Sequence, residues 1–204
     1  REITRWVVER GARFSRTLAA AGLDLTVSVN VSALDIQNPD FAREVLGLLR
    51  ATPIDPKRLC LEITERAVVQ NIETTRRTLA ELREVGVQIA IDDFGTGYAV
   101  LSHLKDLPVD TLKIDTVFVR ELGVNAGDLA IVRAIIALAE AFGLQVVAEG
   151  VETSEAALTL MRHGCHRAQG FLFSRPVPGP AAEAMLASRW MAMPFLADSQ
   201  ALVI

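Results

Sequence analysis

The sequence predicts an α/β protein in which parallel strands alternate with helices. Six short apolar runs begin near residues 25, 59, 88, 111, 145 and 168, and segments with helical periodicity separate them. Strands that alternate with helices form a parallel sheet that the helices cover. Six such units fit either an open sheet or most of an eight-stranded barrel. A complete barrel typically needs about 250 residues, so a barrel built from these 204 residues would lack its first units.

The first half of the chain is predicted to contain three helices and two strands. Apolar side chains recur at helical spacing near the start of the chain, and Gly22 suits the end of that helix. Asn38-Pro39 suits a helix start, with proline in the first helical position. In order, the elements are a helix over 1–21, a strand over 25–31, a helix from 38 to about 49, a strand over 59–63 and a helix over 72–85.

The second half repeats this alternation and adds a tail. Its predicted elements are a strand at 89–91, a short helix at 99–104, a strand at 111–114, a helix at 128–142, a strand at 145–148, a helix capped by Thr153 or Ser154, a strand at 168–173 and a helix at 181–190. We assign residues 1–190 to one domain and 191–204 to a C-terminal tail of undecided structure. The chain begins inside a helix without an initiating Met, so we expect upstream sequence to be missing.

Composition limits the function classes. With 50% hydrophobic and 23% charged residues, the chain is typical of a globular protein that folds around a large core. Its net charge of −4 argues against binding to DNA through a basic surface. Cys60 lies in an apolar run, and with Cys165 it forms no metal-binding cluster, so reduced thiols and a cytoplasmic location are expected.

No membrane span is predicted from the sequence itself. The most apolar long segment, 129–148, contains Arg133, Glu140 and Gln145, and it is better interpreted as a buried helix followed by a strand. A membrane anchor elsewhere in a longer parent protein stays open.

The stretch around Asp92 and Asp93 has the clearest functional signal. Two adjacent carboxylates follow the apolar run 89–91, and Gly95 and Gly97 then allow a sharp turn. Neighbouring ionised carboxylates repel each other in a partly dry site, and a divalent cation would compensate for that repulsion. Alternatively, one aspartate caps the next helix and the other faces water.

Polar residues occur at or near the end of every apolar run. In an α/β barrel the active site lies at the carboxyl ends of the strands, so these residues predict a site there. The carboxylate and amide oxygens suit Mg²⁺ or Mn²⁺ rather than zinc, and a shared aspartate could bridge two ions about 3.5–4 Å apart for phosphoester hydrolysis. The residues are Asn30, Glu62, Asp92, Asp93, Lys113, Glu149 and Gln169.

The role of Lys113 has three readings. It could hold or deprotonate an attacking water, or stabilise charge on a phosphate. It could instead form a structural ion pair with Asp115 or Glu149. A third reading makes it the Schiff-base nucleophile of an aldolase, although the surplus of metal-type ligands argues against that. The three histidines, His103, His163 and His166, share no ligand spacing and are expected to be structural.

Six short motifs follow one another from residue 30 to 176. They are Asn30-Val31-Ser32, Glu62-Ile63-Thr64-Glu65, Asp92-Asp93-Phe94-Gly95-Thr96-Gly97-Tyr98, Lys113-Ile114-Asp115, Ala148-Glu149-Gly150-Val151-Glu152-Thr153 and Gln169-Gly170-Phe171-Leu172-Phe173-Ser174-Arg175-Pro176. In this order they resemble the motifs of the EAL domain family. This family comprises bacterial cyclic di-GMP phosphodiesterases, which act in second-messenger signalling such as biofilm control, and their inactive relatives.

The resemblance implies a TIM-like (β/α)8 barrel, here without its first strands, and hydrolysis of cyclic di-GMP to pGpG with Mg²⁺ or Mn²⁺, two ions in all. It implies that Lys113 positions or activates the attacking water and that Gln169 supports water and substrate. Glu65 would hold the loop after Asp93, which in this family links the metal site to a homodimer interface, and Asp115 and Glu152 would support the site. The implied metal ligands are Asn30, Glu62, Asp92, Asp93 and Glu149.

The chain also departs from the family pattern. The Glu-Ala-Leu segment is absent, and with it a metal-ligand Glu and a phosphate-contacting Arg. We expect the parent protein to supply them, together with an upstream sensory or GGDEF domain; the alternative is an inactive domain that binds cyclic di-GMP or a protein. Ala99 and Val100 replace small hydroxyl residues that are common in the family, and Arg175 replaces a more usual Lys.

Overall fold

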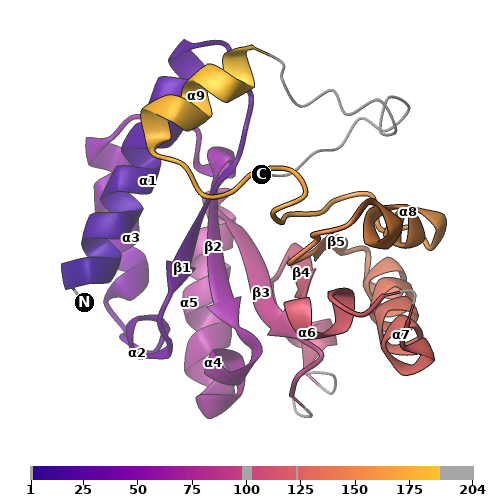
Figure 1. Ribbon diagram of the computed structural model, residues 1–204. Helices are drawn as coiled ribbons and strands as arrows, with labels where there is room; N and C mark the ends of the chain where they lie inside the picture. Colours follow the sequence, from indigo (N-terminus) through magenta and orange to yellow (C-terminus); the bar gives the residue numbers. More distant parts are fainter. Residues whose placement is uncertain (1, 98–102, 123, 189–204) are drawn as a thin grey trace. The chain divides into compact units, whose positions relative to one another are not determined.

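The computed structural model describes residues 2–97, 103–122 and 124–188. It divides into two compact units. The first unit consists of Arg1–Asp92 and Gly97–Asp110, and the second consists of Asp93–Thr96 and Thr111–Ile204. Within each unit parallel strands alternate with helices, which confirms the predicted α/β class (Figure 1).

Three parallel strands form the centre of the first unit. They are β1 (Val27–Val31), β2 (Leu59–Thr64) and β3 (Gln88–Phe94). Val29 is opposite Leu61 in the β1–β2 ladder, and Leu61 is opposite Ile89 in the β2–β3 ladder. These three side chains are at most 4% exposed. We call the face that carries these side chains, which α1 packs against, the core face of this unit; β2 is buried on its other face too, at Cys60 and Glu62.

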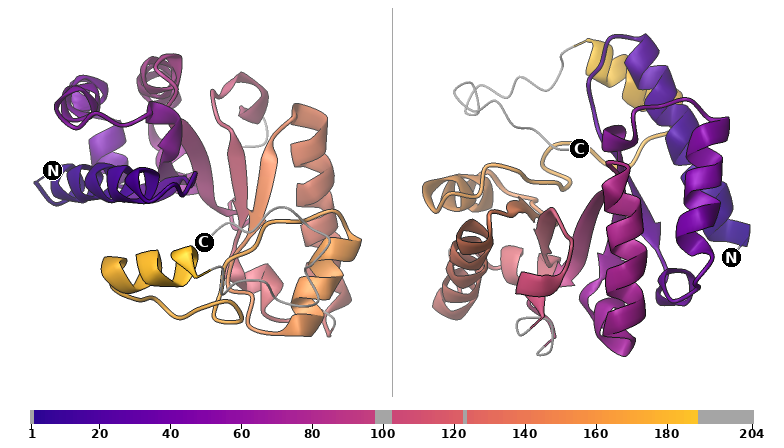
Figure 2. Two further views of the ribbon diagram at one scale, coloured as in Figure 1. Left: turned by 90° about the horizontal axis from the view of Figure 1, so that it is seen from above. Right: turned by 180° about the vertical axis from the view of Figure 1, so that it is seen from behind.

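Helices cover that core face. The long ones are α1 (Glu2–Ala20), α3 (Phe41–Ala51) and α5 (Ile72–Glu84), while α2 (Ala33–Ile36) and α4 (Glu65–Gln70) are short. Figure 2 shows α1, α3 and α5 side by side along the strands. Gly11 allows α1 to approach β1 closely, because a Cβ atom there would lie 2.7 Å from Cγ2 of Val29. Leu79 and Leu82 of α5 are fully buried.

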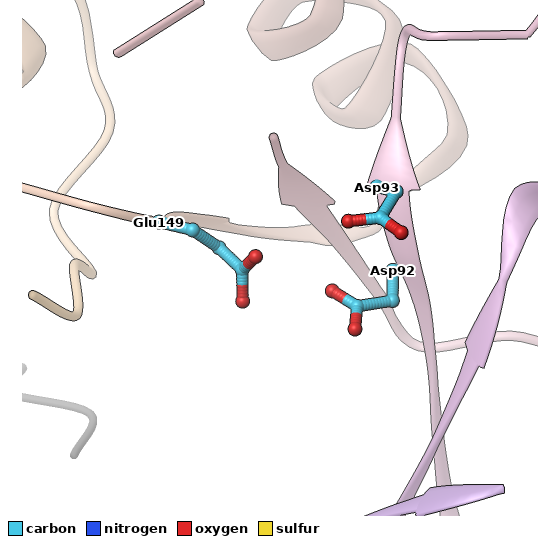
Figure 3. A group of neighbouring side chains, drawn as sticks. All are labelled: Asp92, Asp93 and Glu149. Atoms are coloured by element: carbon cyan, nitrogen blue, oxygen red, sulfur yellow. The ribbon is translucent and has the colours of Figure 1, made fainter. Parts of the chain in front are cut away.

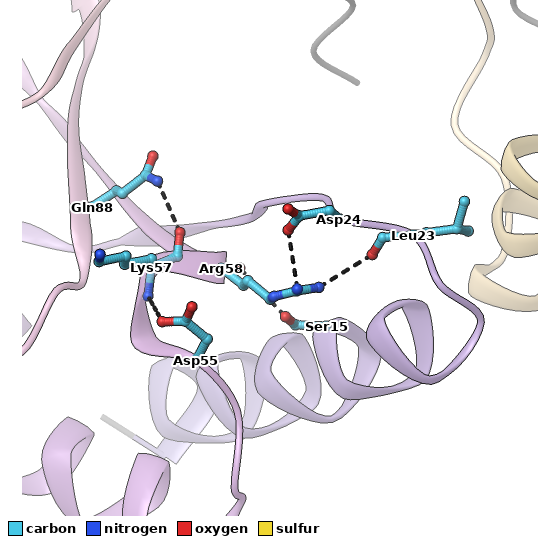
Figure 4. Close-up of polar contacts among 7 residues, drawn as sticks. All are labelled: Ser15, Leu23, Asp24, Asp55, Lys57, Arg58 and Gln88. Atoms are coloured by element: carbon cyan, nitrogen blue, oxygen red, sulfur yellow. Dashed lines mark hydrogen bonds and ion pairs between the residues drawn. The ribbon is translucent and has the colours of Figure 1, made fainter.

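Arg58 connects the segment that precedes β1 with the segment that precedes β2 (Figure 4). Its guanidinium group donates a hydrogen bond to the carbonyl of Leu23 at 3.3 Å and forms an ion pair with Asp24 at 3.1 Å. The buried Ser15 hydroxyl of α1 donates to the Arg58 carbonyl at 3.5 Å. These contacts fix the amino ends of β1 and β2. They do not involve the carboxyl ends, where the predicted site residues lie.

A second polar contact stabilises the amino end of β3. Asp110 accepts a hydrogen bond from the Ile89 amide at 2.9 Å and pairs with the Arg83 guanidinium at 2.8 Å. The Gln88 side chain donates to the carbonyl of Lys57 at 2.8 Å (Figure 4). The amino ends of these strands therefore have a structural role.

The second unit contains the parallel pair β4 (Thr111–Ile114) and β5 (Gln145–Ala148). Helix α7 (Ala126–Phe142) packs on both strands. It begins at the Asn125 cap and ends at Gly143, whose φ of 67° suits a glycine C-cap. The remaining helices are α6 (Thr116–Val119), α8 (Ser154–Arg162) and α9 (Gly179–Ala187), and two 3₁₀ turns lie in the first unit, at Pro56–Arg58 and Leu104–Asp106.

Several predicted boundaries need correction. The predicted strand at 168–173 is wrong: Ala168 forms an isolated bridge with Ala148, and the segment then turns. Helix α3 begins at Phe41 rather than at Pro39, because Asp40 occupies the N-cap position. Strand β3 extends through Phe94, so both aspartates lie within it rather than beyond its end.

Other predictions shift slightly or fall outside the described residues. The strand predicted from residue 25 begins at Val27, and the helix predicted from 128 begins at Ala126. Thr153, not Ser154, caps α8. The last helix spans Gly179–Ala187 instead of 181–190. Most of the predicted helix at 99–104, the positions 99 and 100 discussed above, and the tail 191–204 lie outside the described residues.

Within the described ranges, no helix is both long and apolar enough to cross a membrane.

The two cysteines are buried and form no disulfide. Burial raises the pKa of the Cys165 thiol to about 11 from its ordinary value of 9.0.

This pKa shift predicts a pH dependence of stability. The folded chain binds the Cys165 proton more tightly than the unfolded chain does, so the associated stability is present below about pH 9 and lost between about pH 9 and 11. The difference in unfolding free energy between wild type and Cys165→Ala should be constant below pH 8.5 and change by about 2–3 kcal/mol toward pH 11. Urea titrations at several pH values would measure it; a pH-independent difference would contradict the shift.

Candidate active site

Three oxygen-bearing side chains share one face of the strands in the first unit. Asn30 is opposite Glu62 in the β1–β2 ladder, and Glu62 is opposite Ala90 in the β2–β3 ladder. Asp92 follows Ala90 by two residues, and side chains alternate between faces along a strand. Asn30, Glu62 and Asp92 therefore project from the same face, opposite the core face. Glu62 is 8% exposed, whereas Asn30 is exposed.

Glu65 holds the glycine turn in the first unit. It follows β2 directly, is 5% exposed, and accepts a hydrogen bond from the Gly97 amide at 3.1 Å through Oε2. A Cβ atom at position 97 would lie 2.7 Å from the Glu65 carboxylate. The glycine is therefore required for this close approach.

Asp93 and Glu149 bring two carboxylates together in the second unit (Figure 3). Each offers a carboxylate oxygen, and these two atoms lie within 4.8 Å of each other. Asp93 has a φ of 55°, the one positive value found at a non-glycine residue in the described part of the chain. Such a conformation has a free-energy cost of about 1–3 kcal/mol, and it is typical of functional positions. Asp92 precedes Asp93 directly and is drawn with the pair.

Lys113, Glu149 and Gln169 form a nearly buried polar group. The Lys113 Nζ lies 2.6 Å from Oε1 of Glu149, and these side chains are 5% and 12% exposed. The Gln169 side-chain amide donates to the same Oε1 at 2.6 Å. The ion pair predicted as one alternative for Lys113 is therefore present, with Glu149 rather than Asp115.

Backbone contacts fix Glu149 and Gln169. The Glu149 amide donates to the Ile114 carbonyl at 3.1 Å, and the Gln169 amide donates to the Ala148 carbonyl at 2.8 Å. A Cβ atom at Gly150 would lie 2.3 Å from the Thr116 side chain. The segment after β5 is thus packed against α6 in a way that admits no side chain at position 150.

The predicted supporting residues Asp115 and Glu152 have different surroundings. Asp115 caps α6 by accepting a hydrogen bond from the Val117 amide at 2.7 Å. Glu152 is exposed and, with Gln169, lines a pocket of about 610 Å³ in the second unit. Arg175 lies 4.7 Å from the centre of the Phe171 ring at this pocket.

The donor chemistry fits a hard divalent cation. The group of neighbouring ligand atoms found among the described residues consists of carboxylates, with no histidine or cysteine. The predicted donors are Asn30, Glu62 and Asp92 in the first unit and Asp93 and Glu149 in the second. Oxygen donors of this kind suit Mg²⁺ or Mn²⁺. Schiff-base chemistry fits less well, because Lys113 pairs closely with a carboxylate.

Sequence reasoning missed two features near these residues. The left-handed conformation of Asp93 has no sequence signal beyond the fact that aspartate adopts it more readily than most non-glycine residues. The buried Asp35, in the short helix after β1, gave no periodic signal.

Comparison with known proteins decides the family. The family model of the EAL domain matches residues 1–176. This chain belongs to the EAL domain family. It is similar to the crystal structure of the EAL domain of Mycobacterium smegmatis DcpA, with 57% sequence identity and a TM-score of 0.87. The aligned region covers 92% of this chain and 84% of that one. This similarity confirms that the fold is of the EAL type.

Two further structures contain ligands. The PaMucR phosphodiesterase in a c-di-GMP complex is 40% identical with a TM-score of 0.85, covering 89% of this chain and 74% of that one. The manganese and cy-diGMP complex of Klebsiella pneumoniae BlrP1 is 34% identical with a TM-score of 0.76, covering 86% and 45%.

Curated relatives are longer than this chain. Rv1354c of Mycobacterium tuberculosis is 53% identical over 92% of the chain, and the cyclic di-GMP phosphodiesterase NbdA of Pseudomonas aeruginosa is 42% identical over 91%. The chain spans 30% and 24% of these two proteins.

Proposed function

We propose that this EAL domain hydrolyses one phosphodiester bond of cyclic di-GMP and releases the linear dinucleotide pGpG. Relatives that are named for this activity or bound to this nucleotide support the proposal. The observation that carries it is the nearly buried Lys113–Glu149–Gln169 group with the Asp93 carboxylate close to Glu149. Of the five predicted metal ligands, Asn30, Glu62 and Asp92 share one face of β1–β3. Glu149 belongs to this polar group, and Asp93 lies close to it.

The proposed site binds Mg²⁺ or Mn²⁺, two ions in all, through Asn30, Glu62, Asp92, Asp93 and Glu149. When bound, such ions lower the pKa of water and stabilise negative charge on phosphate. A manganese complex of a relative with the same nucleotide supports this choice of metal. Because four of these five side chains are carboxylates, the site without cations would be strongly repulsive.

The residues of the chain would then have distinct roles. Lys113 orients the attacking water and donates a hydrogen bond toward phosphate oxygens. Gln169 fixes Glu149 by donating to its Oε1. The water oxygen attacks phosphorus and the water gives up a proton, the P–O3′ bond breaks, and the 3′ oxygen takes up a proton, so that the product carries a 5′ phosphate. Low exposure strengthens each of these electrostatic contacts.

Substitution of the predicted ligands tests this proposal. In the full-length protein, Glu62→Ala and Asp92→Ala should each lower hydrolysis of cyclic di-GMP by at least about 10²-fold, because a metal ligand is lost. Glu84→Ala, at an exposed position at the end of α5, is the matched control and should leave turnover unchanged. Chromatographic separation of pGpG measures the rate, and unchanged turnover in both ligand variants would contradict the site.

The alternative is a domain that binds cyclic di-GMP or a protein partner without cleavage. Nucleotide binding by the full-length protein with no turnover at saturating Mn²⁺ would select it.

The proposal further includes a homodimer, an upstream sensory or GGDEF domain, and a cytoplasmic location. The small share of the longer relatives that this chain spans supports additional domains, and two cysteines without a disulfide suit a reducing compartment.

A further inference from the structure

A buried carboxylate lies just beyond the strand that carries Asn30. Asp35 is 4% exposed and belongs to α2. Its Oδ2 accepts a hydrogen bond from the Thr4 hydroxyl of α1 at 2.6 Å and another from the Ser32 hydroxyl. A buried carboxylate is stable when such bonds are made, and bonds to a charged acceptor are stronger than neutral ones. Asp35 therefore connects α1 to the segment that follows β1.

The same contacts fix the backbone two residues after Asn30. The Asp35 amide donates to Oγ of Ser32 at 3.2 Å and to the Ser32 carbonyl at 3.1 Å, so that Ser32 is held from both its side chain and its backbone. Within the first unit, the ladder with β2 sets the register of β1. The contacts among Thr4, Asp35 and Ser32 add a link from α1 to the segment that follows Asn30.

We propose that Asp35 is a positioning residue for the metal site. Through Ser32 and Thr4 it holds Asn30 in the register that places the Asn30 amide beside Glu62. This inference rests on the proposed function, because it takes Asn30 and Glu62 as metal ligands. Neither Asp35 nor Thr4 is one of the predicted ligands, so their effect would be exerted through the position of Asn30.

Substitutions of Thr4 and Asp35 in the full-length protein test the inference. Thr4→Val removes the hydroxyl and keeps the shape of the side chain, while Thr4→Ser keeps the hydroxyl and is the matched control. Electron paramagnetic resonance titration with Mn²⁺, without nucleotide, measures metal affinity directly. We expect Thr4→Val and Asp35→Asn to raise the dissociation constant of Mn²⁺ about tenfold, the size of effect seen for residues that orient ligands, with Thr4→Ser close to wild type. Turnover at saturating Mn²⁺ should stay within threefold.

A second control separates positioning from general stability. Arg83→Met removes the ion pair with Asp110 at the amino end of β3, and it should lower the melting temperature without changing Mn²⁺ affinity. Mn²⁺ affinity within twofold of wild type in Thr4→Val would overturn the inference, and so would an equal loss in Arg83→Met. If Asp35→Asn does not fold, Thr4→Val decides. A wild-type protein that neither binds Mn²⁺ nor cleaves cyclic di-GMP would instead refute the proposed function.

Discussion

Replacing Lys113 with methionine should lower kcat for cyclic di-GMP hydrolysis by about 10²–10⁴-fold, the range for a group that takes part in proton transfer or stabilises charge in the transition state. The ammonium group lies 2.6 Å from Glu149 Oε1, and Lys113 is 4% exposed. Methionine fills similar volume but cannot donate a hydrogen bond or carry charge. It would also leave Glu149 without this cation, which disturbs a predicted metal ligand.

Steady-state kinetics of the full-length protein at saturating Mn²⁺ would measure this effect. Lys105→Met, at an exposed position in the 3₁₀ turn Leu104–Asp106, is the matched control and should behave as wild type. The Schiff-base reading is tested in parallel, because borohydride should trap no carbonyl compound on Lys113. A loss of less than fivefold in Lys113→Met would show that the lysine is a structural ion-pair partner.

Replacing Gly170 with alanine should be the most destabilising substitution at any glycine of the site. A Cβ atom there would lie 2.2 Å from the carbonyl oxygen of Val151 and 2.3 Å from its nitrogen. These are backbone atoms, which cannot move aside as a side chain can. The Val151 amide donates to Gln169 at 3.0 Å, and the Leu172 amide donates to Val151 at 3.0 Å, so the clash would break the pairing that holds Gln169.

We expect Gly170→Ala to lower the unfolding free energy by more than about 4 kcal/mol, in the range of the most disruptive single substitutions. Chemical denaturation would measure it. Gly47→Ala is the matched control: Gly47 is exposed in α3, nothing lies within 4 Å of the added Cβ, and alanine should stabilise the helix by about 0.5–1 kcal/mol. Equal stability of Gly170→Ala and wild type would show that the 148–172 segment is not packed as described.

Segments with a clear apolar pattern could be predicted from the sequence, and very short helices could not. The helix at 72–85 and the strands at 59–63, 111–114 and 145–148 agree with the structure to within a residue at each end, because their apolar patterns are complete and glycine or proline bounds them. Helices α2, α4 and α6 have four to six residues, too few to show a helical period. The run 168–173 is apolar like a strand, but Gly170 and the turn after it prevent a ladder.

For the site, the sequence could indicate residue types and strand ends but not contacts. Lys113 and Gln169 both contact Oε1 of Glu149. In the sequence, Glu149 and Gln169 follow Lys113 by 36 and 56 positions. The register of β1, β2 and β3 sets which side chains share a face, and that register depends on long-range ladders. The contact between Thr4 and Asp35 likewise spans 31 positions.

The most direct test of the central claim is turnover of cyclic di-GMP by the full-length protein, measured with Mg²⁺ or Mn²⁺ and again with chelator. The account predicts conversion to pGpG that requires the cation and stops when the chelator is added. Binding of the nucleotide without cleavage at saturating metal would contradict it and would make this EAL domain a receptor.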